Sequence, residues 1–209
     1  MLHHYKNKFK GKTCLVIGNG PSLRNVPDYF LDSYPCFGAN KIFLRYTPMF
    51  YVAVNKLVIE QNRTVINMLD CDKFLPRGSG IESNELPITR VKKFCYDLSS
   101  EIYEGYTVTF VSLQLAYYMG FSTVLLVGVD HKYDFIGKPN EVFHMSGDDP
   151  NHFSPDYFKG QLWNNPDLNQ SEVSYTMAEM AYRSDKRKIL NLTEGTELNV
   201  FSKDKIENW

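Results

Sequence analysis

The stretch Thr-Cys-Leu-Val-Ile-Gly-Asn-Gly-Pro-Ser at residues 13–22 joins a short apolar run to a glycine-rich turn. An apolar run of this length that ends in glycine is typical of a strand buried on both faces, as in a parallel sheet. The turn predicts close backbone approach and positive φ angles at Gly18 and Gly20. We expect a short helix to follow over Leu23 to Leu31, with its first N–H groups directed at an anion in the turn.

Similar patterns recur along the rest of the chain. Further strands are predicted over residues 35–38, 49–54, 74–76, 121–130 and 188–192, with an edge segment at Val200-Phe201. Helices are predicted between them over residues 57–69, 108–119 and 173–182. Strands that alternate with helices indicate an α/β fold with a doubly wound, mostly parallel, Rossmann-like sheet.

Two segments show no such periodicity. Residues 77–90 contain glycine, serine, asparagine and proline, and we interpret them as a loop. The segment 131–170 is polar and aromatic and contains His131, His144, His152 and Trp163. A segment of that length in a compact domain is functional or disordered, and its aromatic residues argue against disorder. With no repeat or linker, residues 1–209 are predicted to form one domain with a functional loop at about 131–170.

Composition narrows the range of partners and locations. The chain has 23 Lys and Arg residues against 24 Asp and Glu, without a basic stripe, so no nucleic-acid partner is expected. No apolar run approaches the roughly 20 residues of a membrane span, and the start of the chain does not resemble a signal peptide. We therefore predict a cytoplasmic protein whose four cysteines are reduced. An aromatic content of 14% is compatible with a homo-oligomer surface.

Glycines and polar side chains follow the C-terminal ends of several predicted strands. They are Gly18, Asn19, Gly20, Asn40, Asn55 and Asp130. In α/β sheets, ligands bind outside the carboxyl ends of the strands, so these residues are predicted to line one site. The loop is neither a Walker loop nor a dinucleotide fingerprint, because no Gly-Lys-Ser/Thr follows and Leu23 occupies the place of the third glycine. The alternative is a tight turn without a ligand, with the asparagine amides bonded to nearby backbone groups.

The sequence Gly-Asn-Gly-Pro-Ser-Leu at residues 18–23 resembles the opening loop of bacterial sialyltransferases that use CMP-activated sugars. The fold of those enzymes is a metal-independent variant of the glycosyltransferase A type. The sequence is also similar to a bacterial and archaeal family of formerly unknown function. That family includes 6-hydroxymethylpterin diphosphokinases and flagellar motility accessory factors implicated in nonulosonate transfer. The resemblance extends over most of the chain, through residues 37–40, 51–55, 113–120, 127–131, 151–158 and 191–195.

The resemblance implies roles for individual residues. It places the nucleotide phosphates against Gly18, Asn19, Gly20, Pro21 and Ser22. Asn40 and Asn55 match asparagines that reach the phosphate and the sugar in the sialyltransferases, which neutral amides can do by donating hydrogen bonds. Tyr133 and Tyr157 are candidates for binding the leaving phosphate through their hydroxyls, and packing of their rings is the alternative. Residues 107–109 fall where those enzymes contact the nucleoside, although the residue types differ.

His152 is the first candidate for general acid–base chemistry. A reference pKa of about 6.5 suits the removal of a proton from an acceptor hydroxyl at neutral pH. The sialyltransferases place their catalytic histidine in the corresponding segment, where Asp156 could align instead. Asp130 and His131, at a strand end, are the second candidates, and a purely structural histidine is the alternative for either ring.

These residues lead to three functional hypotheses. The first is a metal-independent glycosyltransferase that moves a sugar, such as a nonulosonate, from a CMP-activated donor to a glycan or protein hydroxyl. The second is an ATP-dependent diphosphokinase for a hydroxymethylpterin-like substrate, which would need Mg²⁺ on Asp130 or on the pair Asp148 and Asp149. The third is a non-catalytic nucleotide-binding module of a glycan-assembly system. Asp70-Cys71-Asp72 has the spacing of a metal-binding Asp-x-Asp motif, and we interpret it as a solvated turn.

Overall fold

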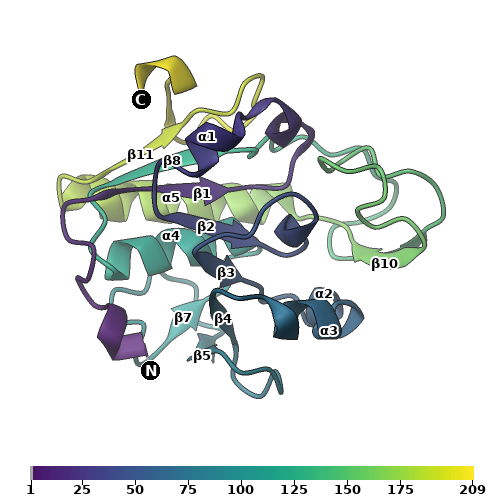
Figure 1. Ribbon diagram of the computed structural model, residues 1–209, viewed down its shortest axis with the longest axis horizontal. Helices are drawn as coiled ribbons and strands as arrows, with labels where there is room; N and C mark the ends of the chain where they lie inside the picture. The colour runs from purple at the N-terminus through teal and green to yellow at the C-terminus, as the bar shows by residue number, and fades with distance from the viewer. Residues whose placement is uncertain (1) are drawn as a thin grey trace.

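The computed structural model describes residues 2–209 and has an eight-stranded sheet at its centre (Figure 1). The strands are β1 (Thr13–Ile17), β2 (Cys36–Ala39), β3 (Phe50–Val52), β4 (Asp72–Pro76), β5 (Asn84–Leu86), β8 (Thr123–Val127), β11 (Lys188–Asn191) and β12 (Ser202–Lys203). Their order is β12-β11-β8-β1-β2-β3-β4-β5, and every neighbouring pair is parallel. The predicted α/β fold with a mostly parallel, doubly wound sheet is therefore confirmed.

The order of the strands reverses between β1 and β8. From β1 the chain builds the sheet outward through β2, β3, β4 and β5, and then returns to add β8, β11 and β12 on the other side. At such a switch point the connections leave the sheet in opposite directions and open a crevice outside the carboxyl ends of the strands. A ligand site is therefore expected beside the ends of β1 and β8.

Helices cover both faces of the sheet. Residues of α4 (Val108–Tyr118) and α5 (Leu168–Ser184) pack in the core on one face, and residues of α1 (Asp28–Leu31) pack in the core on the other. The smaller helices are α2 (Lys56–Gln61), α3 (Arg63–Met68) and the 3₁₀ helices η1 (Leu2–Tyr5), η2 (Pro21–Asn25), η3 (Ile42–Leu44) and η4 (Ile206–Asn208). No helix within residues 2–209 has the length and apolar character needed to cross a membrane.

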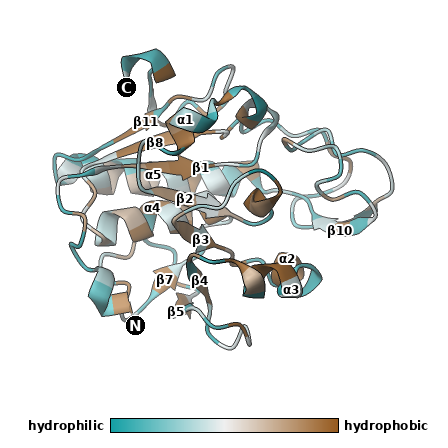
Figure 2. Ribbon diagram, in the orientation of Figure 1, coloured by the Kyte–Doolittle hydropathy of each residue, from teal (hydrophilic) through white to brown (hydrophobic). Residues whose placement is uncertain are grey.

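Successive residues of β1 alternate between the two apolar cores. Cys14 and Val16 pack on the face that α4 and α5 cover, whereas Leu15 and Ile17 pack on the face that α1 covers. This alternation puts apolar side chains on both faces, as a buried parallel strand requires. Figure 2 shows the result for the whole sheet, with hydrophobic residues on the central strands and hydrophilic residues on the outer loops.

The helix predicted over residues 108–119 is confirmed as α4. Its residues from Thr109 to Tyr118 are all buried, which accounts for the apolar character on most of its sides. The Thr107 side chain caps it by accepting from the N–H of Thr109 (3.3 Å). Gly120 follows the helix with a φ of +91°, a left-handed conformation that glycine adopts without strain.

Two other predicted helices are interrupted. The helix expected over Leu23 to Leu31 is replaced by η2 and α1, with an extended backbone at Pro27 between them. Proline supplies no N–H, so it begins a new helix and does not continue the previous one. The helix expected over 57–69 consists of α2 and α3, which meet at Asn62, where Nδ2 donates to the carbonyl of Val58 (2.8 Å).

The two predicted loops contain regular structure. Residues 77–90 include β5 and β6 (Ile88–Thr89), and β6 pairs with β7 (Ile102–Tyr103). Residues 131–170 include the antiparallel pair β9 (Val142–Met145) and β10 (Gln161–Asn164), and they also include the start of α5. These strands are short, and each gains its hydrogen bonds from another strand, so the local pattern of residues did not reveal them.

Candidate active site

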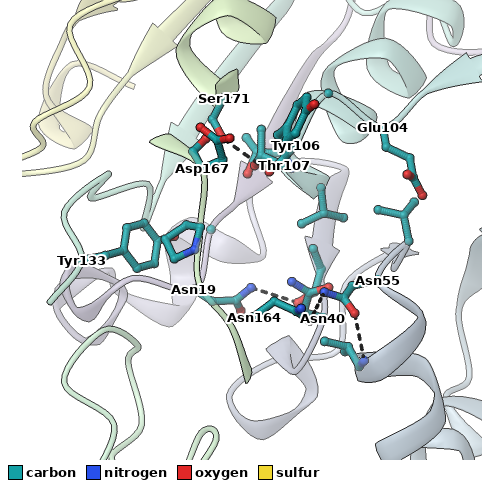
Figure 3. A pocket seen from close by; sticks show the side chains of 18 of the residues that line it. Asn19, Asn40, Asn55, Glu104, Tyr106, Thr107, Tyr133, Asn164, Asp167 and Ser171 are labelled. Carbon is teal, nitrogen blue, oxygen red and sulfur yellow. Dashed lines mark hydrogen bonds between the residues drawn. The ribbon is translucent and has the colours of Figure 1, made fainter. Parts of the chain in front are cut away.

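A pocket of about 1040 Å³ lies at the carboxyl ends of β1, β2, β3 and β8, at the switch point of the sheet. The predicted site residues that line it are Gly18, Asn19, Gly20, Asn40, Asn55, Asp130, His131, Tyr133 and His152. Pro21, Ser22 and Tyr157 are not part of its lining. Figure 3 shows Asn19, Asn40, Asn55 and Asn164 grouped on one side of the pocket, with Glu104, Tyr106, Thr107, Asp167 and Ser171 on another.

The glycines of the loop allow close contact between the turns that follow β1 and β8. A Cβ atom on Gly18 would overlap the carbonyl oxygen of Gly128, and one on Gly20 would overlap the carboxylate of Asp130. The N–H of Gly20 donates to the carbonyl of Gly128 (2.9 Å). The prediction of positive φ angles at Gly18 and Gly20 is wrong, because the left-handed residue of this contact is Gly128, with a φ of +69°.

Asp130 holds the glycine loop through both of its carboxylate oxygens. Oδ1 accepts from the backbone N–H of Ser22 (3.0 Å), and Oδ2 accepts from the Ser22 hydroxyl (2.7 Å). These bonds occupy the carboxylate that the sequence offered for acid–base work or for Mg²⁺. Only the five-residue 3₁₀ helix η2 follows the loop, so the longer helix expected to point at an anion does not form there.

Two asparagines at strand ends leave polar atoms without partners. The Nδ2 of Asn19 donates to the carbonyl of Ala39 (3.0 Å), but Oδ1 of Asn19 and Oδ1 of Asn40 are enclosed and unpaired within residues 2–209. Enclosed polar atoms are paired in most folded proteins, so these two carbonyl oxygens are exceptions, and each needs a hydrogen-bond donor such as a water molecule. Asn40 also has a φ of +53°, a left-handed conformation that asparagine tolerates better than most residues.

Asn55 uses the two ends of its side-chain amide differently. Oδ1 caps α2 by accepting from the N–H of Leu57 (2.9 Å), and this is the backbone role that the sequence left open as an alternative. Nδ2 donates to Oδ1 of Asn164 on β10 (3.2 Å). The donor end of Asn55 therefore lies on the pocket side, where a phosphate oxygen would compete with Asn164 for it.

His152 is paired with a buried carboxylate that the sequence analysis considered only as a metal ligand. Its Nδ1 lies 2.8 Å from Oδ2 of Asp149, whose side chain is completely buried. Oδ1 of Asp149 accepts from the N–H of Asn151 (2.8 Å). The ring of His152 stacks on Tyr157, with centroids 4.0 Å apart and planes 5° apart. The only sequence signal for this pair is the spacing Asp-x-x-His.

Two cations, the exposed Arg24 and the buried Lys41, bond to main-chain carbonyls of the segment that carries His152. Arg24, just after the glycine loop, donates to the carbonyls of Phe153 (2.6 Å) and His152 (3.1 Å). Lys41, which follows Asn40, donates from Nζ to the carbonyl of Tyr157, and burial lowers the pKa of this lysine. The N–H of Phe153 also donates to the carbonyl of Asn19 (2.9 Å). The histidine segment is thereby joined to the loop after β1.

The two predicted tyrosines lie in different surroundings. Tyr157 is fully buried, and its hydroxyl accepts from the backbone N–H of Lys41 (2.9 Å), so the packing alternative describes it. Tyr133 lines the pocket between His152 and Trp163, with ring centroids 6.3 Å and 6.4 Å away. Burial raises the pKa of both hydroxyls, so each remains a neutral donor at physiological pH.

His131 has partners of its own. Its Nε2 lies 3.1 Å from Oε1 of Glu172 on α5, and its ring packs edge-on against Tyr175. The Glu172 side chain is 51% exposed, in contrast to Asp149. His131 also has a φ of +54°. The predicted neighbours Asp130 and His131 thus both line the pocket, but their side chains take different partners.

A strained turn lines the pocket at the side away from the asparagines. Gly105 and Tyr106 have φ angles of +65° and +63°, and the hydroxyl of Ser171 donates to the carbonyl of Tyr106 (3.3 Å). Left-handed residues other than glycine cluster at ligand sites because the surrounding structure must hold them. Burial raises the pKa of the adjacent Glu104 carboxyl. Sequence reasoning found only residues 107–109 in this region, since no local pattern marks the turn.

No acidic cluster for a metal is found within the described chain. There, no group of three or more His, Cys, Asp or Glu side chains lies close enough together to hold an ion. Asp70-Cys71-Asp72 lies at the amino end of β4, opposite the pocket end of the sheet, and both carboxylates are exposed. Its interpretation as a solvated turn agrees with this position.

No family model matches the amino-acid sequence, and no curated protein matches it. The structure is similar to that of the MAf glycosyltransferase from Magnetospirillum magneticum AMB-1, with a TM-score of 0.64 and 13% identity, over 98% of this chain and 35% of that one. It is also similar to the sialyltransferase CstII from Campylobacter jejuni, with a TM-score of 0.50 and 13% identity, over 94% of this chain and 86% of that one. This chain shares the fold of these two enzymes.

The likeness at 13% identity concerns the fold, and the chain spans 35% of the length of the MAf enzyme. The parallel sheet brings the predicted donor-site residues other than Pro21, Ser22 and Tyr157 to the carboxyl ends of its strands, where a doubly wound sheet opens its crevice. The predicted resemblance to 6-hydroxymethylpterin diphosphokinases gains no support from a family match and stays a prediction.

Proposed function

We propose that this chain is a glycosyltransferase that moves a sugar, such as a nonulosonate, from a CMP-activated donor to a hydroxyl of a glycan or protein. The observation that carries the proposal is the pocket at the switch point, which gathers the glycine loop, three strand-end asparagines and a carboxylate-paired histidine. Two glycosyltransferases with the same fold support it, and one of them, the sialyltransferase CstII, was solved in complex with CMP.

In this proposal the donor extends across the pocket. Its phosphate lies against the backbone of residues 18–20, where Asn40 and Asn55 donate hydrogen bonds without adding charge. Its nucleoside occupies the side lined by Glu104 and Thr107. Both groups of residues line one cavity of about 1040 Å³, which is large enough for a nucleotide and a sugar.

The proposed reaction is a displacement at the anomeric carbon of the donor. The oxygen of the acceptor hydroxyl forms a bond to that carbon, and the bond from the carbon to the phosphate oxygen breaks. The bonding electron pair leaves with CMP, and the acceptor proton passes to Nε2 of His152. Tyr133, a neutral donor at the same pocket, is placed to stabilise the leaving phosphate.

Nucleotide binding is the first test of this function. We expect CMP and CDP to raise the melting temperature without a metal. At a ligand concentration 100 times Kd, binding should add about 2.7 kcal/mol to the free energy of unfolding. Asn40→Asp keeps a residue that tolerates the left-handed backbone, but it replaces the amide donor with a charge that repels phosphate, so the shift should disappear. Asn67→Asp, at an exposed position on α3, is the matched control and should retain the shift.

The other hypotheses give different results in the same assay. Stabilisation by ATP only with Mg²⁺ would support the diphosphokinase. Stabilisation by CMP, without release of CMP from any CMP-sugar in the presence of glycan acceptors, would support a non-catalytic module. If no nucleotide shifts the melting temperature, the proposed function is contradicted.

A further inference from the structure

Hydrogen bonds fix the side chain of Asp149 beside the ring of His152. The Asp149 carboxylate is completely buried and is fixed at both oxygens, by the N–H of Asn151 on Oδ1 (2.8 Å) and by Nδ1 of His152 on Oδ2 (2.8 Å). Its own N–H donates to the carbonyl of Pro155 (2.7 Å). The carboxylate therefore cannot rotate without losing both of its hydrogen bonds, and the backbone bond to Pro155 fixes the main chain that carries it.

This arrangement determines which nitrogen of His152 carries the proton. A neutral imidazole has one N–H donor and one acceptor nitrogen, and an ionised carboxylate can only accept. Nδ1 must therefore carry the hydrogen that Asp149 accepts, which leaves the lone pair on Nε2. Nε2 makes no hydrogen bond to any residue from 2 to 209 and is not enclosed, and His152 lines the pocket.

The ring of His152 is held in the same orientation by its other neighbours. It stacks on Tyr157 with ring centroids 4.0 Å apart, and Tyr133 lies edge-to-face with centroids 6.3 Å apart. Burial raises the pKa of both tyrosine hydroxyls, so neither contributes a negative charge near neutral pH. Lys41 lies on the Tyr157 ring, 5.4 Å from its centroid, and Arg24 binds the carbonyl of His152 (3.1 Å). Asp149 is thus the carboxylate in contact with the ring.

We propose that Asp149 is a positioning residue that holds His152 in the Nδ1–H tautomer and stabilises the imidazolium formed when Nε2 accepts a proton. The role in catalysis rests on the function proposed above. In that reaction the proton moves from the acceptor hydroxyl to Nε2, Asp149 remains ionised, and CMP leaves with the electron pair. His131 has no equivalent support, because Glu172 is half exposed and contacts Nε2.

The substitution Asp149→Asn should reverse the direction of the hydrogen bond at Nδ1 of His152. The N–H of Asn151 still needs an acceptor, so the new side-chain oxygen stays with it. The new NH₂ group then takes the place of Oδ2 and donates to Nδ1, which moves the ring proton to Nε2. Asp134→Asn is the matched control, since it makes the same change at an exposed carboxylate of the same segment.

The test reads the tautomer directly by ¹⁵N–¹H correlation spectra of the histidine rings in the protein without substrate. The chain has five histidines, and loss of one signal set in His152→Gln assigns the ring of interest. We expect Nδ1–H in the wild type and in Asp134→Asn, and Nε2–H in Asp149→Asn. With a CMP-sugar donor, kcat of Asp149→Asn should fall by about 10²- to 10⁴-fold while KM for the donor stays unchanged.

Other outcomes have separate meanings. An Nε2–H tautomer in the wild type overturns the proposal, even if Asp149→Asn does not fold. An unchanged tautomer and an unchanged kcat in Asp149→Asn also overturn it. A third outcome is an Nδ1–H tautomer in the wild type and an Nε2–H tautomer in Asp149→Asn, without turnover of any CMP-sugar. That result would support the positioning of His152 by Asp149 and would contradict the proposed function.

Discussion

At the scale of single residues, Asn55 combines a structural and a ligand-facing role in one side chain. Its oxygen caps α2 and its nitrogen lies on the pocket side, bonded to Asn164. A side-chain oxygen at the N-cap satisfies backbone N–H groups that have no partner inside the helix. The presence of asparagine at this strand end therefore does not by itself indicate phosphate binding, and the two roles have to be separated by substitution.

Asn55→Asp and Asn55→Ala separate them. Aspartate is as good an N-cap as asparagine, so Asn55→Asp should keep the free energy of unfolding, whereas Asn55→Ala should lower it by about 1 kcal/mol. Both remove the donor, and Asn55→Asp adds a charge that repels phosphate, so both should weaken CMP binding. Urea unfolding and titration calorimetry measure the two effects. Wild-type affinity in Asn55→Asp would mean that Asn55 acts only as a helix cap.

At the scale of elements, the segment 131–167 is joined to the sheet by a few specific hydrogen bonds. Arg24, just after the glycine loop, donates to the carbonyls of His152 and Phe153, and the carbonyl of Asn19, within the loop, accepts from the N–H of Phe153. The β9–β10 pair belongs to this segment and forms a sheet separate from the central one. The position of the histidine therefore depends on a contact between elements that lie far apart in the sequence.

Arg24→Met tests that contact. Hydrogen bonds to a charged group contribute about 1.5–3 kcal/mol, and about 1.4 kcal/mol corresponds to a factor of ten in an equilibrium constant. Their loss should therefore speed hydrogen exchange in residues 131–167 by about tenfold or more. Exchange in β1 and β8 should be unchanged. Lys159→Met removes an exposed cation of the same segment and serves as the control. Equal exchange rates in both variants would show that Arg24 does not hold the segment.

At the scale of the whole molecule, two apolar cores share one set of strands. Leu113 of α4 belongs to the core on one face and Leu31 of α1 to the core on the other, and β1 contributes alternate residues to both. Loss of packing on one face should therefore destabilise the strands against which the core on the other face packs. The prediction that residues 1–209 form a single domain therefore has a physical basis and a calorimetric test.

Leu113→Ala and Leu31→Ala should each lower the stability of the same unfolding transition. Both side chains are completely buried, so each truncation should cost about 2–5 kcal/mol, or roughly 2–4 °C in Tm for each kcal/mol. Met180→Ala, at a position 67% exposed on α5, should leave Tm nearly unchanged. Differential scanning calorimetry measures this. Two separate transitions, with each variant shifting only one, would contradict a single cooperative domain.

The sequence by itself determined the parts of the fold that local patterns encode. The strands β1 and β8 are mostly apolar runs followed by glycine, and the helix α4 is apolar on most of its sides, so their burial could be predicted without knowing their neighbours. Because parallel strands end at one edge of the sheet, the glycines and polar residues after them could also be predicted to share a site. The pocket lining agrees with that expectation for the glycine loop and the asparagines.

Only the tertiary structure decided which of these residues meet and what each one does. The strands β5, β6, β9 and β10 are defined by pairing with other strands, and Gly18 is required because the backbone of Gly128 lies against it. Asp130 binds Ser22 and Asp149 binds His152, although all four are equally visible in the sequence. The role of a polar side chain depends on the partner that satisfies its hydrogen bonds and on its exclusion from water, and both are set by the packing of distant segments.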